Sequence, residues 1–139
     1  MSATFILDCS LTMSWCFPDE ATEASTKILD RLEDETGLVP THWFLEVANV
    51  LAMAEKKKRI TLAKLTEFIA QIGVMDFEVD NESASRAFNH ILALCRDYGL
   101  TAYDAAYLDL ALRRRLPLAS LDDELRAAAK KAGVQVIGK

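Results

Sequence analysis

The sequence is poor in the residues that build disulfide frameworks and zinc sites. It has three cysteines and two histidines in 139 residues. The cysteines are odd in number and show no CxxC spacing, which argues against both kinds of site. A nucleophilic Cys–His pair is an alternative that the sequence leaves open, although no cysteine stands near a histidine along the chain. The simpler interpretation is that the three thiols are small buried side chains.

Long apolar runs are also absent. No stretch is long enough to cross a bilayer as a helix. The N-terminal residues MSATFILDCSL have no basic flank ahead of their apolar run, which argues against a signal peptide. These two absences predict a cytoplasmic protein that has no membrane partner.

The chain also has no excess of basic residues, and its formal net charge is −5. Nucleic-acid-binding domains are usually basic, so the overall charge does not indicate that function. The basic residues are gathered in three runs, 56–59, 113–115 and 130–131, each at the end of a predicted helix. The simpler interpretation is that they offset the helix dipole and face solvent. The alternative is that they bind phosphate.

The composition and the pattern of apolar residues are those of an α/β protein. Hydrophobic residues make up 51% and charged residues 27%, which fits one globular domain over residues 1–139. The predicted strands are 4–8, 38–40, 76–80, 117–121 and 134–137. They alternate with predicted helices at 18–37, 41–58, 62–75, 82–98, 103–115 and 122–133. This alternation predicts a single-domain α/β/α sandwich with a central parallel β-sheet.

Two acids stand at the carboxyl ends of predicted strands. Asp8 closes the run TFIL, and Asp122 follows PLASL. Ligands of open α/β sheets bind at the carboxyl ends of the strands, so we predict that both acids face a site. Asp122 has a competing structural role, because Asp122 and Asp123 open a predicted helix, where carboxylates are favoured as caps. Asp123 could also take the place of Asp122 in the site.

Two further acids lie on predicted helices. Asp104, in TAYD, fits a capping box opened by Thr101, and Glu46 lies at the margin of an apolar stripe. Each has a structural interpretation of its own, as a helix cap and as a partly solvated boundary residue. Together with the strand-end acids they predict a cluster of carboxylates.

Such a cluster has a definite chemistry. Neighbouring carboxylates raise one another's pKa, and a hard divalent cation such as Mg²⁺ or Mn²⁺ relieves their repulsion. A water bound to that cation can attack a phosphodiester without any His, Cys or Lys nucleophile. An acidic protein can therefore still act on nucleic acid.

The sequence resembles the PIN-domain proteins, and most closely the VapC-type ribonuclease toxins of prokaryotic toxin–antitoxin pairs. The resemblance is spread over nearly the whole chain and is carried by FILDCS, VPTHWFLEVANVL, GLTAYDAAYLDLALRRRLPLASLD and LRAAAKKAGVQVI. It implies a small α/β/α sandwich with a parallel sheet. It also implies an endoribonuclease that depends on Mg²⁺ or Mn²⁺ and cuts tRNA or another structured RNA.

The resemblance also implies roles for single residues. By position, the family's acidic quartet corresponds to Asp8, Glu46, Asp104 and Asp122. Asp8 and Asp104 would bind the metal directly, and the other two would complete its shell, bind it through water or orient the attacking water. Ser10 matches a small polar residue that supports the first acid, although it could equally cap the segment after the strand.

Partners follow from the same resemblance. Such toxins form homodimers and are held by a small cognate antitoxin, and an apolar face around Phe68 and Ile72 is available for a partner. Two other classes remain as alternatives. One is a non-catalytic PIN-like binding or scaffold protein. The other is a receiver-type phosphoacceptor domain. Two features do not favour it: Asp8 is followed by Cys9 and Ser10 and not by a second acid, and the last predicted strand is followed by no Lys except the terminal Lys139.

Overall fold

The protein is described here by a computed structural model that covers residues 2–139. A five-stranded sheet forms its centre, in the order β3-β2-β1-β4-β5, and all the strand pairs are parallel. The strands are β1 (Ala3–Leu7), β2 (Thr36–Pro40), β3 (Phe77–Asp80), β4 (Leu118–Ala119) and β5 (Val136–Ile137). Phe5, Ile6 and Leu7 of the middle strand are fully buried, as expected for a parallel strand covered on both faces.

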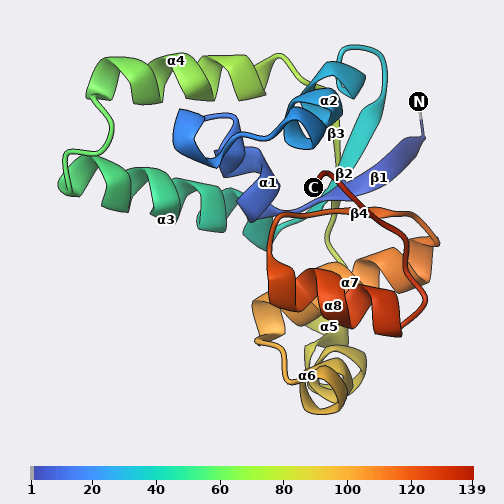
Figure 1. The fold of residues 1–139 in the computed structure, drawn as a ribbon. Helices are drawn as coiled ribbons and strands as arrows, with labels where there is room; N and C mark the ends of the chain where they lie inside the picture. The colour runs from blue at the N-terminus through green and yellow to red at the C-terminus, as the bar shows by residue number, and fades with distance from the viewer. Residues whose placement is uncertain (1) are drawn as a thin grey trace.

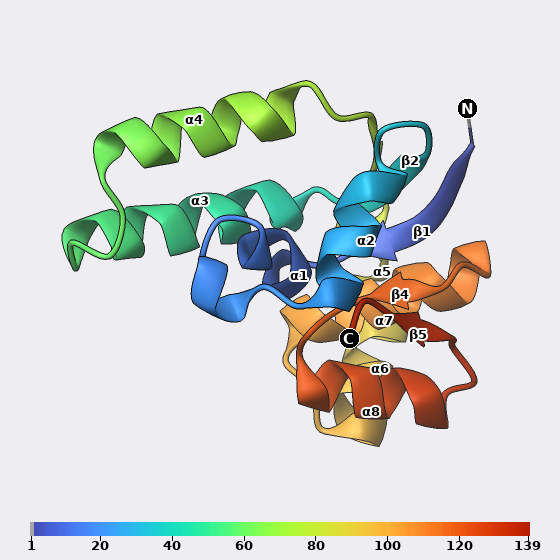
Figure 2. The same ribbon diagram turned by 45° about the horizontal axis from the view of Figure 1, so that its top comes forward.

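Helices cover both faces of this sheet. They are α1 (Cys9–Ser14), α2 (Glu23–Arg31), α3 (His42–Lys56), α4 (Leu62–Gly73), α5 (Ser83–Arg86), α6 (Leu92–Tyr98), α7 (Ala102–Arg114) and α8 (Asp123–Lys131). Figure 1 shows α1 to α4 on one side of the sheet and α5 to α8 on the other. In both views α3 and α4 run side by side as an antiparallel pair that extends away from the sheet (Figure 2). The predicted α/β/α sandwich with a parallel sheet is confirmed.

The predicted helix over 18–37 is wrong at both ends. Pro18–Glu20 forms a short 3₁₀ turn, and α2 begins only after Thr22, whose side chain caps it in a capping box with Ser25. Gly37 does not end the helix but lies inside β2. A Cβ at this position would lie 3.3 Å from side-chain atoms of Leu32 and Phe77, so the close packing of the strand accounts for the glycine.

Other elements also differ from the sequence prediction, and the strand predicted over 117–121 is limited to β4, Leu118–Ala119. The six-residue helix α1 follows β1 directly and is too short to leave a periodic pattern in the sequence. The predicted helix over 82–98 is interrupted by a π-helical turn, Ala87–Ile91, between α5 and α6. It ends, as predicted, at Gly99, which adopts a left-handed conformation with φ of 67°.

The order of the strands determines where a site can form. From β1 the chain moves outward to β2 and β3, and then returns to β4 on the other side of β1. This reversal leaves a crevice at the carboxyl ends of β1 and β4, where ligands of open α/β sheets bind. The backbone N–H of Asp8 donates to the carbonyl of Ala119 (3.1 Å), so the two strand ends lie side by side. No helix in the described part of the chain has the length and apolar character needed to cross a membrane.

Candidate active site

Asp8 lies where β1 turns into α1 and is almost completely buried, with 3% of its surface exposed. It is the N-cap of α1, and its Oδ1 accepts a hydrogen bond from the backbone N–H of Leu11 (2.9 Å). This bond explains why a carboxylate is tolerated at the end of a core strand, because the helix supplies a donor to a group that has lost water.

Two serines supply the other donors to Asp8. Ser120, fully buried after β4, donates to Oδ2 in a short hydrogen bond, and the hydroxyl of Ser10 lies 2.8 Å from both carboxylate oxygens. Each hydroxyl also accepts a backbone N–H, Ser10 from Leu121 (3.0 Å) and Ser120 from Asp122 (3.0 Å). Because an ionised carboxylate only accepts, the single proton of each hydroxyl is directed at Asp8. Ser10 therefore supports Asp8, as the resemblance implies, and Ser120 is a supporting residue that the sequence analysis missed.

Asp104 lies in the first turn of α7. Its backbone N–H donates to Oγ1 of Thr101 (3.2 Å), which makes Thr101 the N-cap. The return hydrogen bond from the Thr101 N–H, which would complete a capping box, does not occur between these two described residues. The cap therefore uses the amide of Asp104 and leaves its carboxylate, which is half-buried, available to the site.

Glu46 lies one turn into α3, and its side chain is 28% exposed. Its Oε1 accepts a hydrogen bond from the hydroxyl of Tyr107, at 2.5 Å. Tyr107 comes three residues after Asp104 on α7, so both lie on the same face of that helix. The bond brings Glu46 of α3 next to the helix that carries Asp104.

Asp122 and Asp123 are separated by the structure. Asp122 is the N-cap of α8, and its Oδ1 accepts from the backbone N–H of Leu125 (2.8 Å). Asp123 is exposed and forms an ion pair with Lys139, whose charge and hydrogen bond hold the pKa of that carboxyl below its usual range. Asp122 thus caps a helix and also reaches the site, whereas Asp123 faces solvent.

One cavity of about 280 Å³ gathers the four predicted acids. It lies at the carboxyl edge of the sheet, and its lining consists of Asp8, Cys9, Ser10, Met13, Glu20, Glu46, Val50, Asp104, Tyr107 and Asp122. The four carboxylates come from the end of β1, from α3, from α7 and from the start of α8. Residues that are up to 114 positions apart in the sequence therefore share one cavity.

The pKa values of two of these acids are raised above their ordinary range, mainly by burial. Burial raises the pKa of Asp8 to about 7, against the hydrogen bonds that favour its charged form. Burial also raises the pKa of Asp104 to about 6, and the negative charges of Asp122 and Glu46 add to the effect. A bound cation would favour the charged form of both carboxylates and so offset this effect of burial.

The donor set fits a hard divalent cation that keeps most of its waters. All the donors are carboxylate oxygens, which Mg²⁺ and Mn²⁺ prefer. Within residues 2–139, however, no three Asp, Glu, His or Cys side chains stand close enough to hold a metal between them. The three donors to Asp8 leave about one acceptor position free on its carboxylate. The chain is therefore suited to a cation held by one or two carboxylates and by water.

Cys9, which also lines the cavity, is not an activated nucleophile. Burial raises the pKa of its thiol to about 12, and the charges of Glu46 and Asp8 add to this effect. A thiol that stays protonated neither attacks nor binds metal well. The alternative of a Cys–His pair therefore has no support at this site.

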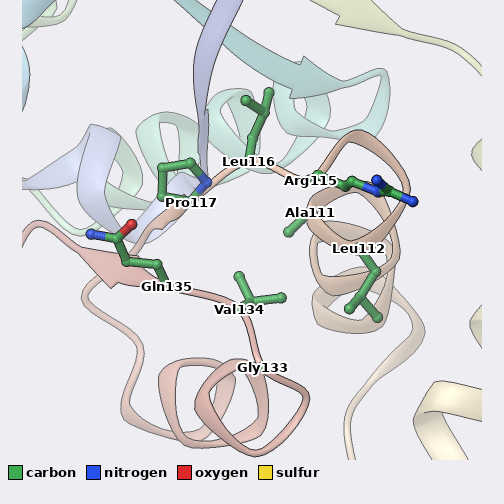
Figure 3. Close-up of a pocket in the computed structure, with 8 residues that line it drawn as sticks. All are labelled: Ala111, Leu112, Arg115, Leu116, Pro117, Gly133, Val134 and Gln135. Atoms are coloured by element: carbon green, nitrogen blue, oxygen red, sulfur yellow. The ribbon is translucent and has the colours of Figure 1, made fainter.

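A second cavity, of about 310 Å³, lies at the opposite edge of the sheet (Figure 3). It is bounded by the end of α7 and by the segments that lead into β4 and β5. Arg115 is the one charged residue that lines it, and none of the predicted acids is near. The cavity of the four acids is therefore the candidate active site.

The structure corrects the interpretation of Arg113 and of the apolar face, whereas Lys56 to Arg59 are exposed, as predicted for a run that faces solvent. Arg113 does not face solvent but pairs with Asp80 (3.1 Å) and Asp109 (3.2 Å), where it joins α7 to the end of β3. Arg59 pairs with Asp19 and Glu20 across the chain. Phe68 is buried in the core, whereas Ile72 lines an apolar groove against α3 together with the exposed Ile69.

The fold is a parallel α/β/α sandwich, and its candidate site is a cavity of four acids at the carboxyl edge of the sheet. The chain matches the PIN domain model over residues 5–131, and it belongs to the PIN domain family. PIN domains are in general nucleases. No curated protein sequence matches this chain.

Solved structures share the fold over nearly the full length of both chains. PAE2754 from Pyrobaculum aerophilum has a TM-score of 0.67 at 22% identity, with 98% of this chain and 92% of that chain covered. FitAcB from Neisseria gonorrhoeae has a TM-score of 0.61 at 18% identity, with 96% of each chain covered. VapBC2 from Rickettsia felis, solved with a DNA fragment from its promoter, has a TM-score of 0.62 at 12% identity, with 96% of each chain covered. At these identities the likeness is one of fold.

The separation of Asp122 from Asp123 makes a testable prediction. Asp122→Asn should lower nuclease activity by about tenfold or more, because it removes a negative charge from the cavity. Asparagine still caps a helix well, so α8 should remain folded. Asp123→Asn is the matched control and should leave activity unchanged. Cleavage rates of the two variants, measured together with their thermal stability, check this, and a larger loss for Asp123→Asn would mean that Asp123 is the fourth acid.

Proposed function

We propose that this chain is an endoribonuclease that depends on Mg²⁺ or Mn²⁺ and acts as the toxin of a toxin–antitoxin pair. One observation carries the proposal: four carboxylates from four separate segments line one cavity at the carboxyl edge of the sheet. Structural caps alone would have no reason to converge, since each helix end needs only one. Membership of a family of nucleases gives the type of reaction, which is hydrolysis of a phosphodiester bond.

The roles of the residues follow from their surroundings. Asp8 and Asp104 would hold the cation, because their raised pKa values mark the places where positive charge is most needed. When bound, such a cation supplies a water of lowered pKa and stabilises charge on the phosphoryl oxygens. Ser10 and Ser120 fix the carboxylate of Asp8. Glu46 and Asp122 would bind water at the margin of the site and orient it toward the phosphorus.

The substrate and the partners of this function rest on the family resemblance. We assign tRNA or another structured RNA as the substrate, and a small cognate antitoxin and a second copy of this chain as partners in the cytoplasm. Support comes from the names of the similar structures, which include a toxin–antitoxin complex from Klebsiella pneumoniae with a TM-score of 0.57 and 17% identity over 91% of each chain. An apolar groove between α3 and α4, lined in part by Phe44 and Ile69, offers a surface for a partner helix.

The test uses the protein freed of any co-purifying partner. It is incubated with total cellular RNA and with Mg²⁺, with Mn²⁺ or with a chelator, and the cut ends are mapped by sequencing. We expect cuts at a few sites that require the metal, because the carboxylates cannot activate water alone. RNA left intact under all three conditions, by a protein that still binds Mn²⁺, would instead support a non-catalytic PIN-like binding or scaffold protein.

A further inference from the structure

We propose that Tyr107 is a positioning residue for Glu46, and that its hydroxyl fixes one carboxylate oxygen so that the other can act in the site. The inference rests on the proposed function, since it concerns the same cavity. It goes beyond the acidic quartet, because it assigns a role in the site to Tyr107, an uncharged and buried residue of α7.

The first observation is that Glu46 has little else to hold it. Within residues 2–139 the hydroxyl of Tyr107 is the one group that donates a hydrogen bond to its carboxylate, at 2.5 Å from Oε1. Oε2 receives no such bond from the described residues. A glutamate side chain has several rotatable bonds, and at 28% exposure it is not fixed by packing alone. Without Tyr107, the repulsion from the other acids would favour rotamers that point toward solvent.

The second observation is that Tyr107 itself is rigidly placed. The residue is 1% exposed, and its ring packs edge-on against the ring of His42, with 5.0 Å between the centroids. Burial, with the charge of Glu46 beside it, raises the pKa of the phenol far above its ordinary value. The hydroxyl therefore keeps its proton and always acts as a donor toward Glu46.

The third observation concerns His42, which could otherwise compete for the same role. Its Nε2 lies 3.5 Å from Oε1 of Glu46 but only 3.1 Å from the carbonyl oxygen of Tyr103. A carbonyl oxygen accepts and never donates, so Nε2 carries the hydrogen and directs it at Tyr103. His42 thus ties α3 to the first turn of α7, and Tyr107 is left as the donor to Glu46.

These contacts join the two helices that carry acids. Two bonds cross from α3 to α7, one through His42 and one through Glu46, and both fall within one turn of Asp104. The distance between Glu46 and Asp104 is therefore set by the chain itself before any cation arrives. A site that is arranged in advance does not have to reorganise at the moment of reaction.

The variant that tests this is Tyr107→Phe, which removes the hydroxyl and keeps the buried ring. We expect RNA cleavage to slow by about tenfold and the dissociation constant for Mn²⁺ to rise by a factor of about 2 to 10, as loss of one hydrogen bond implies. Tyr98→Phe, on α6, is the matched control and should change neither quantity. Mn²⁺ binding is measured by calorimetry without RNA, at equal folded fractions.

A second comparison separates positioning from a general structural role. If Tyr107 acts through Glu46, adding Tyr107→Phe to a Glu46→Ala variant should cause no further loss of cleavage or of Mn²⁺ affinity. A full further loss in that background would overturn the inference. The inference would also be overturned if Tyr107→Phe left cleavage and Mn²⁺ affinity unchanged. Tighter Mn²⁺ binding by Tyr107→Phe would overturn it as well, because the hydroxyl of Tyr107 would then compete with the metal for Oε1 of Glu46.

The two proposals fail in different ways. If the wild type never cuts RNA, the proposed function fails, and the Mn²⁺ measurements still decide whether Tyr107 positions Glu46. If the wild type cuts RNA and Tyr107→Phe matches it in both measurements, the proposed function stands and the positioning role is overturned.

Discussion

Replacing Asp104 by asparagine is expected to reduce RNA cleavage by about a hundredfold to a thousandfold, which is about the cost of removing one group that stabilises the charge of a transition state. Asparagine has the same shape as aspartate but cannot supply the negative charge that holds a divalent cation. The backbone N–H of residue 104 still donates to Thr101, so the cap of α7 is kept. The rate of metal-dependent cleavage of total cellular RNA, at the sites that the wild type cuts, measures the effect.

The fold of the Asp104→Asn variant should be at least as stable as that of the wild type without metal. Burial and the charges of Asp122 and Glu46 make ionised Asp104 unfavourable, so its neutral replacement relieves repulsion. Asp97→Asn, which removes an exposed acid from α6, is the control and should keep full activity. If Asp104→Asn instead unfolds while the folded molecules cleave RNA normally, the acid is only a part of the helix cap.

The positions of the acids could be predicted from the sequence because each depends on a local pattern. An apolar run that ends in an acid places Asp8 directly after β1 and Asp122 three residues beyond β4, and a parallel sheet brings these strand ends to one edge. The capping pattern places Asp104 in the first turn of its helix. These predictions need only neighbouring residues and one rule about sheets.

The residues that support the acids could not be found in that way. Ser120 meets Asp8 across 112 positions of the chain, and Tyr107 meets Glu46 across 61. A serine and a tyrosine are both ordinary in these segments, so no local sequence pattern indicates that Ser120 or Tyr107 supports an acid. The same holds for Arg113, which looks like part of a solvated basic run and in fact pairs with Asp80 and Asp109.

The errors in the fold have a related cause. The helix predicted over 18–37 follows a run of good helix formers, but the capping box of Thr22 and Ser25 starts a new helix there. Competition of this kind depends on side-chain hydrogen bonds, which periodicity does not record. Helix α1 escapes notice because its six residues are too few to show a periodic pattern, and its cap is the same Asp8 that faces the site. The candidate catalytic acid Asp8 is thus also a structural cap.

Without metal, the protein should become less stable as the pH rises from 5 to 8, and Asp8→Asn should remove most of that loss. The pKa of Asp8 is about 7 in the folded chain and 3.8 in the unfolded one. Between these values the folded state holds a proton that the unfolded state has released, so the stabilisation present below pH 4 disappears as the pH passes 7. A difference of about 3 pKa units corresponds to at most about 4 kcal/mol in the free energy of unfolding.

The measurement is urea unfolding in the presence of a chelator at several pH values. Asp104, whose pKa is about 6, should also lower the free energy of unfolding as the pH rises, but by less than Asp8 does. The stability of Asp8→Asn should therefore still fall slightly with pH. Glu35, with a pKa lowered to about 2 by Arg31, stays charged throughout this range and does not contribute. Asp97→Asn should keep the wild-type slope. A wild type whose stability is constant from pH 5 to 8 would mean that Asp8 stays ionised in the fold and that its hydrogen bonds with Ser120, Leu11 and Ser10 outweigh its burial.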